Sequence, residues 1–542
     1  MKHKFAIKCC PGIRALFMIL VFGGILGAQS QRWIEPEDLV YAWIERYAGA
    51  VVPDLNLSAK PHTQKELYEA LQMIEKLSSL SEKERRINHY WRQQLNPEKL
   101  SDSGIKPLFK NVLHFQEDAI EPAIWSWSRG GDTLRIDLHE MLRLENNGEA
   151  LRPIWKDGIH FSANVGARAA IFLDGVRYLY LQNEQFLQPP KEFKGGRIGE
   201  NDEGVQYNSF EAARGGISYI GDFGRFSLAK YPILWGNSDR SLILSGNAPA
   251  FSWLGWKKSW QKISLNFFHG SLMPQDCPIP SDSLGRQCVK KYIVGHRWEL
   301  KPRPSIELAF YEVYLYGNRT MELDYFIPPI LLYPTEHDLM DRDNGTMAFE
   351  ATVRRSAFKL YGTLFLDELR LSELFGFWWG NKQGIQAGVS LFGNLSSFPI
   401  NTTVELTAIR PWTYTHKYDW NSYIHHGAGL GFPLGPNSQQ LFAGIQLFLS
   451  PRSNLAASFT FQKKGADTFN GFPVGSEPNQ NYEERDQTLD FSTPWLLGEI
   501  SENKIFNLAW RYQWSNVLST ICTASYSSQD GFYSALQLGI AF

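Results

Sequence analysis

The sequence lacks several features that define common protein classes. Beyond the first 30 residues it has no stretch of 18 apolar residues, so we expect no membrane-spanning helix in the exported chain. Its formal charge is only -2, which gives no support to nucleic-acid binding, because such surfaces are strongly basic. Charged residues make up 20% and hydrophobic residues 43% of the chain, and this balance argues against disorder.

Catalytic signatures are missing too. There is no GxSxG nucleophile elbow, no P-loop and no HExxH zinc motif. Asp367 and Glu368 do not make a glycosidase pair, because neighbours on a strand point to opposite faces, and an ion pair with an Arg or Lys is expected for either one. We therefore expect a non-enzymatic protein with no cofactor.

A loose group of His and Asp residues invites a metal-site interpretation. Its spacing matches neither a structural nor a catalytic zinc pattern, so hydrogen bonding within a loop is the favoured interpretation and no metal is expected. The group consists of His416, Asp419, His425 and His426.

Aromatic residues and glycine, by contrast, are abundant. The 18 Trp, 23 Tyr and 35 Phe residues are 14% of the 542-residue chain, alongside 45 Gly. The mean hydropathy is nevertheless -0.29. A transmembrane β-barrel reconciles these values, because Trp and Tyr gather at its two lipid–water boundaries while polar residues line its lumen.

Residues 1–30 have the layout of a secretory signal peptide. Basic residues precede the apolar run Ala15–Leu26, and Ala28-Gln29-Ser30 offers a small-x-small cleavage site. In an oxidising compartment Cys277 and Cys288 could close a small disulfide loop; the alternative is two free thiols. Cys522 is left single.

Residues 31–124 are predicted to form a periplasmic α-helical bundle and a linker. Leu39, Trp43 and Tyr47 recur at a spacing of four, which is typical of an amphipathic helix. Thr63–Glu66 and Ser81–Glu84 fit the capping box that begins a helix. Three short helices bury little apolar area alone, so we expect them to dock on the rest of the chain.

Residues 125–542 are predicted to form an outer-membrane β-barrel, because the apolar period changes there from 3.6 to 2. In 358–366, for example, apolar Leu360 and Leu364 alternate with polar Lys359 and Thr363. At about 22 residues per strand and loop, about 18 antiparallel strands are expected. The chain stops on Phe542, which resembles the signal that outer-membrane proteins present to the barrel-insertion machinery.

The predicted connections are of two lengths. Lys301–Pro304 and Pro451–Asn454 are brief turns, and Asp174-Gly175 reads as a tight hairpin. Met273–Lys290 and Gly465–Gln487 are long and polar. Outer-membrane barrels show this asymmetry, with short periplasmic turns and longer external loops.

Several motifs resemble the Wzi-type capsule assembly family. Residues 234–249, LWGNSDRSLILSGNAP, are similar to its WG…SLxLSxNAP segment, although Asn237 stands where proline is usual. Segments 366–373, 378–382, 405–416 and 431–437 resemble the same superfamily, especially Bacteroidota members related to gliding-motility outer-membrane proteins. The resemblance implies an outer-membrane barrel that binds or anchors capsular polysaccharide or exopolysaccharide at the cell surface. Its partners would be that polysaccharide, outer-membrane lipid and lipopolysaccharide, with the barrel itself a monomer.

Aromatic residues beside polar ones are the candidate polysaccharide contacts, because glycans offer both C–H faces and hydroxyl groups. For each ring the competing interpretation is a place in the aromatic girdle. The candidates are Trp235 with Arg240 and Asn247, Trp378 with Trp379, and Trp412 with Tyr414 and His416.

Three other functions stay open. The barrel could be a structural or adhesion component of a surface machinery such as gliding. It could be a diffusion porin, although a helical bundle in the lumen would pass little current. A barrel hydrolase such as a lipid A deacylase would need a Ser–His pair at one rim.

Overall fold

The computed structural model describes residues 32–51, 55–96, 123–129, 132–149, 151–166, 168–180, 209–275, 288–368, 370–373 and 376–541. The predicted signal peptide, Cys277 and Phe542 lie outside these residues. Cys288 is disulfide-bonded, and Cys522 is a free thiol.

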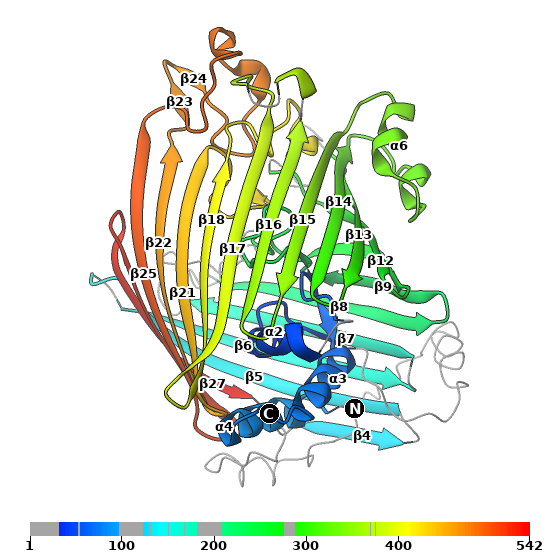
Figure 1. The fold of residues 1–542 in the computed structure, drawn as a ribbon, viewed down its shortest axis with the longest axis vertical. Helices are drawn as coiled ribbons and strands as arrows, with labels where there is room; N and C mark the ends of the chain where they lie inside the picture. Colours follow the sequence, from blue (N-terminus) through cyan, green and yellow to red (C-terminus); the bar gives the residue numbers. More distant parts are fainter. Residues whose placement is uncertain are drawn as a thin grey trace, which may run out of the picture.

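Within the described residues, eighteen antiparallel strands close into a barrel (Figure 1), as predicted. Each strand pairs with its neighbour along the chain, and most are 10–15 residues long, enough to cross a bilayer at a tilt. The strands are β5 (Asp132–Asn146), β6 (Leu151–Val165), β7 (Ala169–Tyr180), β8 (Ser209–Gly221), β9 (Gly224–Tyr231), β11 (Phe251–Ser259), β12 (Ile263–Leu272), β13 (Lys291–Arg303), β14 (Ile306–Gly317), β15 (Asn344–Arg354), β16 (Phe358–Glu368), β17 (Lys382–Leu395), β18 (Phe398–Ile409), β21 (Ser438–Ser450), β22 (Ser453–Gly465), β25 (Ile500–Gln513), β26 (Leu518–Ser527) and β27 (Gly531–Ala541).

The barrel closes between its first and last strands. Ser534–Ala541 of β27 pairs with His139–Asn146 of β5. The remaining part of the same β5 edge pairs with a short strand, β4 (Trp125–Arg129). β4 and β27 therefore pair with successive parts of one edge of β5.

The wall has an apolar outside and a polar inside, as the alternation predicts. On β16, Leu360 and Leu364 are exposed, whereas Lys359, Tyr361 and Thr363 are buried. On β27, Leu536, Leu538 and Ile540 point outward and are exposed. Among the described helices, none is both long and apolar enough to cross a bilayer.

The two ends of the barrel differ in their connections. One end, which we call the short-turn end, has connections of two to four residues. Examples are Pro304 and Ser305 between β13 and β14, and Pro451 and Arg452 between β21 and β22. The opposite end, the long-loop end, carries the connections 232–250, 318–343, 410–437 and 466–499. The predicted asymmetry between short and long connections is therefore present.

The hairpin predicted at Asp174-Gly175 is wrong. Both residues lie in the middle of β7, where Asp174 pairs with His160 and Gly175 with Ile159 of β6. Asp174 points into the lumen and contacts the His160 ring, so the polar interior, and not a turn, accounts for this aspartate. The strand before it, β6, ends at Val165, and β7 begins only at Ala169.

Three helices pack together at the short-turn end (Figure 1), namely α2 (Leu39–Val51), α3 (Gln64–Glu75) and α4 (Glu82–Gln94). Both predicted capping boxes are present, at Thr63 and Ser81. The helices dock on the wall as expected, because Trp43 packs against Phe448 of β21 with ring centroids 5.1 Å apart. This helical part is small beside the barrel.

Ion pairs join the helices to the inner wall, and a hydrogen bond joins the segment that follows α2 to it. Glu45 of α2 pairs with Arg354 at 3.1 Å and with Lys359 at 3.5 Å. Arg297 of β13 donates to the Ser58 hydroxyl at 2.8 Å and to the Glu307 carboxylate at 3.0 Å. An N-terminal plug, residues 32–51 and 55–96, therefore occupies part of the lumen at this end.

The connection 232–250, which we call the inner loop, folds into the barrel from the long-loop end. Leu242, Ile243 and Leu244 are buried there with aromatic residues of the inner wall. A two-residue strand of the inner loop, β10 (Leu234–Trp235), pairs with β2 (Ala59–Lys60) of the plug. The plug and the inner loop thus meet inside the lumen.

The remaining elements are short. They are β1 (Trp33–Ile34), β3 (His62–Thr63), β19 (Ile424–His425), β20 (Ala428–Gly429), β23 (Thr468–Phe469), β24 (Phe472–Pro473), α6 (Leu332–Asp338), and the single 3-10 turns η2 (Leu323–Phe326), η3 (Leu371–Glu373), η4 (Asp419–Asn421), η5 (Tyr482–Glu484) and η6 (Gln487–Leu489).

Candidate functional site

Six aromatic rings from three connections form a continuous series at the long-loop end, which we call the aromatic row. Successive ring centroids are 5.9, 5.3, 5.6, 5.6 and 4.7 Å apart. The last two rings are nearly parallel, with 6° between their planes. In order, the row consists of Trp378, Trp379, Tyr482, His416, Tyr418 and Trp420.

Cations lie over several rings of the row. The Arg485 guanidinium is 3.8 Å from the Trp379 centroid, and the Lys382 ammonium is 4.3 Å from that of Tyr482. Arg485 is held in place by two hydrogen bonds to Asp490, at 2.7 and 2.8 Å. The two cations therefore pack on the rings of the row and hold them in place.

A buried arginine ties the connections together beneath the row. Arg410 donates to the backbone carbonyls of Gly376, Trp378 and Thr493 at 3.3, 3.2 and 3.0 Å. These carbonyls belong to the β16–β17 and β22–β25 connections. Burial lowers the pKa of Arg410 from its ordinary value. One side chain thus fixes the position of Trp378 relative to a second loop.

His416 is the polar ring in the row. Its Nδ1 accepts a hydrogen bond from the Tyr418 backbone N–H at 3.1 Å. Burial, together with the nearby Lys382 and Lys417, lowers the pKa of His416 to about 3. The ring is therefore neutral at physiological pH and acts as an aromatic surface.

Two of the predicted contact residues lie beneath the row. Trp412 is only 2% exposed and packs edge-on against Trp379 at 6.3 Å. Tyr414 is also buried, and its hydroxyl donates to the Leu242 carbonyl of the inner loop at 2.7 Å. In this conformation both residues support the row from below.

The three predicted residues at 235–247 lie in or near the lumen. Trp235 is 4% exposed and packs against Phe268 of the inner wall. Arg240 pairs with Glu405 at 3.3 Å. Asn247 donates to the Gly429 carbonyl at 3.1 Å. The structure brings none of them into the aromatic row, and their roles as glycan contacts stay predictions.

Arg240 also borders a polar cavity of about 490 Å³ inside the barrel, between α2, the inner loop and the wall. Its lining includes Lys60, Asp239, Lys359 and Asn401. Nearby Lys60 lowers the pKa of Asp239 below its ordinary value. The cavity lies between the plug, the inner loop and the wall, so it offers room for water or a small polar solute.

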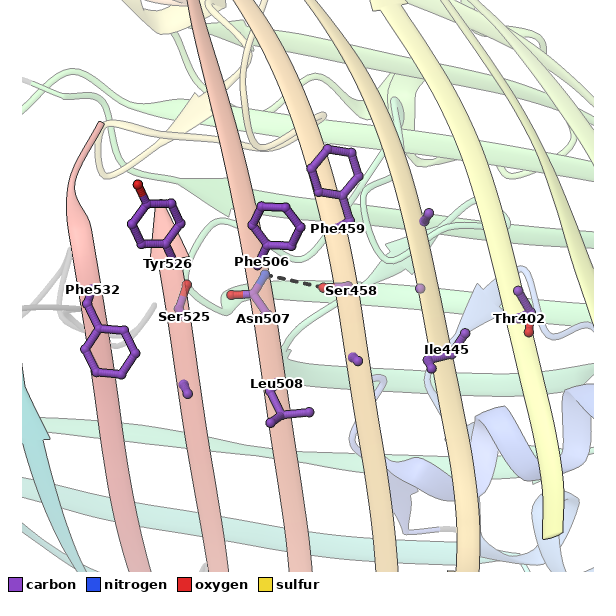
Figure 2. Close-up of a pocket in the computed structure, with 14 residues that line it drawn as sticks. Thr402, Ile445, Ser458, Phe459, Phe506, Asn507, Leu508, Ser525, Tyr526 and Phe532 are labelled. Carbon is purple, nitrogen blue, oxygen red and sulfur yellow. Dashed lines mark hydrogen bonds between the residues drawn. The ribbon is translucent and has the colours of Figure 1, made fainter. Parts of the chain in front are cut away.

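A second hollow of about 490 Å³ lies on the outer face of the wall (Figure 2). Phe459, Phe506, Tyr526 and Phe532 border it, and the small side chain of Ala457 leaves it hollow. Phe506, Tyr526 and Phe532 are exposed. Because its lining is mostly apolar and faces outward, we assign this hollow to the lipid-facing wall.

Asp367 and Glu368 have separate partners, as the strand geometry predicts. The Glu368 carboxylate pairs with Lys382 at 2.8 Å. The Asp367 carboxylate accepts a hydrogen bond from the Tyr414 backbone N–H at 2.6 Å. The predicted ion pair is thus confirmed for Glu368.

The loose histidine group is spread over separate contacts. His416 packs against Tyr482, whereas His425 accepts a hydrogen bond from the Met273 backbone N–H at 3.0 Å. In the part of the chain that the structure describes, no three His, Cys, Asp or Glu side chains are placed to hold a metal ion.

Sequence reasoning missed half of the row. Tyr418, Trp420 and Tyr482 were not among the predicted contacts, nor was Arg485. The signal available for Tyr418 and Trp420 was their closeness to His416 along the chain. Tyr482 lies within the long polar segment Gly465–Gln487, where an isolated aromatic residue is a surface candidate.

No protein family and no curated protein sequence matches the chain. Among solved structures it is similar to Wzi, an outer membrane protein involved in group 1 capsule assembly in Escherichia coli and described as a carbohydrate-binding β-barrel. The TM-score is 0.57 at 14% identity, over 95% of this chain and 100% of that one. Pseudomonas aeruginosa OprD matches with a TM-score of 0.39 at 10% identity, over 76% of this chain and 94% of that one. The likeness to Wzi shows a shared fold.

Proposed function

We propose that this protein is an outer-membrane β-barrel that holds a surface polysaccharide at its aromatic row, without catalysis. The observation that carries the proposal is the row itself. Rings from three connections adjoin one another at one end of the barrel, with Arg485 and Lys382 against them. Sugar C–H groups pack on such rings, and the cations hold the rings in place.

The orientation follows from the two kinds of connection. Outer-membrane barrels place short turns in the periplasm and long loops outside, which puts the plug on the periplasmic side and the row at the cell surface. The exported chain would reach this location through its cleaved signal peptide and the barrel-insertion machinery, and would act there as a monomer.

Two further lines support the proposal. Wzi, which shares the fold, is described as carbohydrate-binding and involved in capsule assembly. The motifs at 234–249 and 405–416 resemble Wzi-type proteins, including Bacteroidota members. The plug and the inner loop, which meet inside the lumen, occupy part of the barrel interior, and this weighs against a diffusion porin.

Binding of the refolded barrel to immobilised capsular polysaccharides tests the proposal. Trp379→Ala and Tyr482→Ala should each weaken binding about fivefold, because each removes a stacking surface. Trp260→Ala is the matched control, since Trp260 is an exposed tryptophan at the short-turn end. Equal binding by the unchanged barrel and all three variants would contradict a glycan contact at the row.

Deletion of the protein in its host is the complementary test. Polysaccharide should appear in the medium while its synthesis continues. Unchanged retention at the cell surface would contradict the proposal, and co-purification with surface proteins in place of glycan would favour a structural role in a surface machinery.

A further inference from the structure

The connection between β14 and β15, residues 318–343, lies against the outside of the barrel wall (Figure 1). We call it the flap; it contains η2 and α6. The outward side chains of β14 at this end are Glu312, Tyr314 and Tyr316, which alternate with the lumenal Tyr311 and Val313. All three are buried, because the flap packs over them.

Specific bonds hold the flap in one conformation. Arg319 donates two hydrogen bonds to Asp343, both at 2.7 Å, which tie its two ends together. The Tyr325 hydroxyl donates to the same carboxylate at 2.6 Å. Glu312 of the wall accepts from the backbone N–H groups of Leu332 and Tyr333 at 3.1 and 3.2 Å.

The wall beneath the flap is polar where a lipid-facing wall would be apolar. His296 is fully buried beside Glu312, at 3.8 Å. His269 stacks on Phe326 of the flap at 4.1 Å and shares a hydrogen bond of 2.7 Å with the Tyr316 hydroxyl. Ionisable groups are costly on a lipid-facing wall, so the flap acts as their cover.

The flap exposes many apolar side chains, beside the exposed charged residues Asp324, Asp338, Asp341 and Arg342. Leu323 and Met340 are 80% and 81% exposed. This surface continues the exposed apolar residues of the wall below, such as Leu308 and Phe349. The exposed apolar residues of the flap are Met321, Leu323, Ile327, Ile330, Leu331, Tyr333 and Met340.

The backbone of the flap limits how deeply the flap can lie in the membrane. Most of the flap is neither helix nor strand, and such backbone does not face the hydrocarbon core, where its N–H and C=O groups would lack partners. Glu312, which the flap reaches, is five residues from the end of β14, or roughly 16 Å along the strand. These two limits place the flap at the boundary between headgroups and acyl chains.

We propose that the flap seats its apolar face in the outer-leaflet interface and so acts as a lateral lipid anchor for the barrel. The occupant of this face is a lipid surface, because the face is continuous with the lipid-facing wall. The inference uses the membrane location in the proposed function, but it is independent of glycan contact at the row.

Site-directed spin labelling in phosphatidylcholine vesicles tests the proposal. The full barrel, with Cys522→Ser to remove the free thiol, carries one nitroxide introduced through Leu323→Cys or Met340→Cys. The matched control is Asn470→Cys, which lies in an exposed turn of a long loop. Collisions with oxygen and with a water-soluble nickel chelate measure whether each label meets lipid or water.

At both flap positions we expect an oxygen-to-nickel collision ratio several-fold above that of the control. A ratio equal to the control would overturn the proposal, because the flap would then face water. Dipolar broadening between labels on separate barrels would also overturn it, in favour of a second copy as the occupant. Glycan binding, measured on the same samples, should be unchanged. Failure of the lipid-anchor proposal can therefore be distinguished from failure of the proposed glycan binding.

Discussion

Replacing Arg297 with methionine should cost far more stability than breaking an exposed ion pair of similar length. The Arg297 guanidinium is fully buried and bonds to Glu299 at 2.5 Å, Glu307 at 3.0 Å and Ser58 of the plug at 2.8 Å. Removing one partner of a buried pair costs about 3–5 kcal/mol, because the other charge is left desolvated. Glu307 keeps one cationic partner in the variant, because Arg354 pairs with it at 2.7 Å. The expected loss of stability therefore stays within this range, although Arg297 makes several bonds.

The matched control is Lys463→Met. Lys463 pairs with Glu502 at 2.9 Å on two neighbouring strands, but both side chains are exposed, so the expected loss is about 0–1 kcal/mol. Urea unfolding of the barrels refolded in vesicles, followed by tryptophan fluorescence, gives both values. Equal losses for the two variants would refute the reasoning that burial sets the cost.

Three further changes test the plug, a histidine and the loops. Trp43→Ala should cost about 3–5 kcal/mol at the plug–wall contact and raise conductance across planar bilayers, whereas Trp260→Ala should leave conductance unchanged. The pKa of His416 is lowered to about 3 in the folded protein, so between about pH 6.5 and 3 the unfolded chain binds a proton that the folded protein does not. The free energy of unfolding should therefore fall as the pH is lowered through this window. His416→Gln should flatten that pH dependence. Arg410→Gln removes bonds to three carbonyls, so the β22–β25 connection should be cleaved faster by protease; an unchanged cleavage rate would show that the arginine does not hold it.

Much of the barrel could be predicted because its physical constraints are local and repeated. Alternation along a segment such as 358–366 reports which side chains meet lipid, whichever strand lies beside it. Capping boxes are similarly local, and both predicted ones are present. The hairpin at Asp174-Gly175 failed because turn propensity is weaker than the pairing of a whole strand with its neighbours.

The candidate site was harder to predict, because burial in a loop depends on contacts between distant segments. Trp412 has a φ of 69°, and the backbone at Gly475 lies directly against its ring. Nothing near Trp412 in the sequence indicates that contact. Trp379 and Tyr482, which adjoin in the row, are likewise about a hundred residues apart along the chain.

The shared edge of β5 has a consequence for how the barrel reaches its correct alignment. β4 and β5 are adjacent in sequence, so their hairpin closes a very short loop, whereas β27 must join β5 across about 390 residues. The hairpin should therefore form first and occupy residues 132–136 of the edge. Only Asp137 and Leu138 lie between the part of the edge that pairs with β4 and the part that pairs with β27. β4 therefore limits how far β27 can slide along β5 in one direction while the final seam forms.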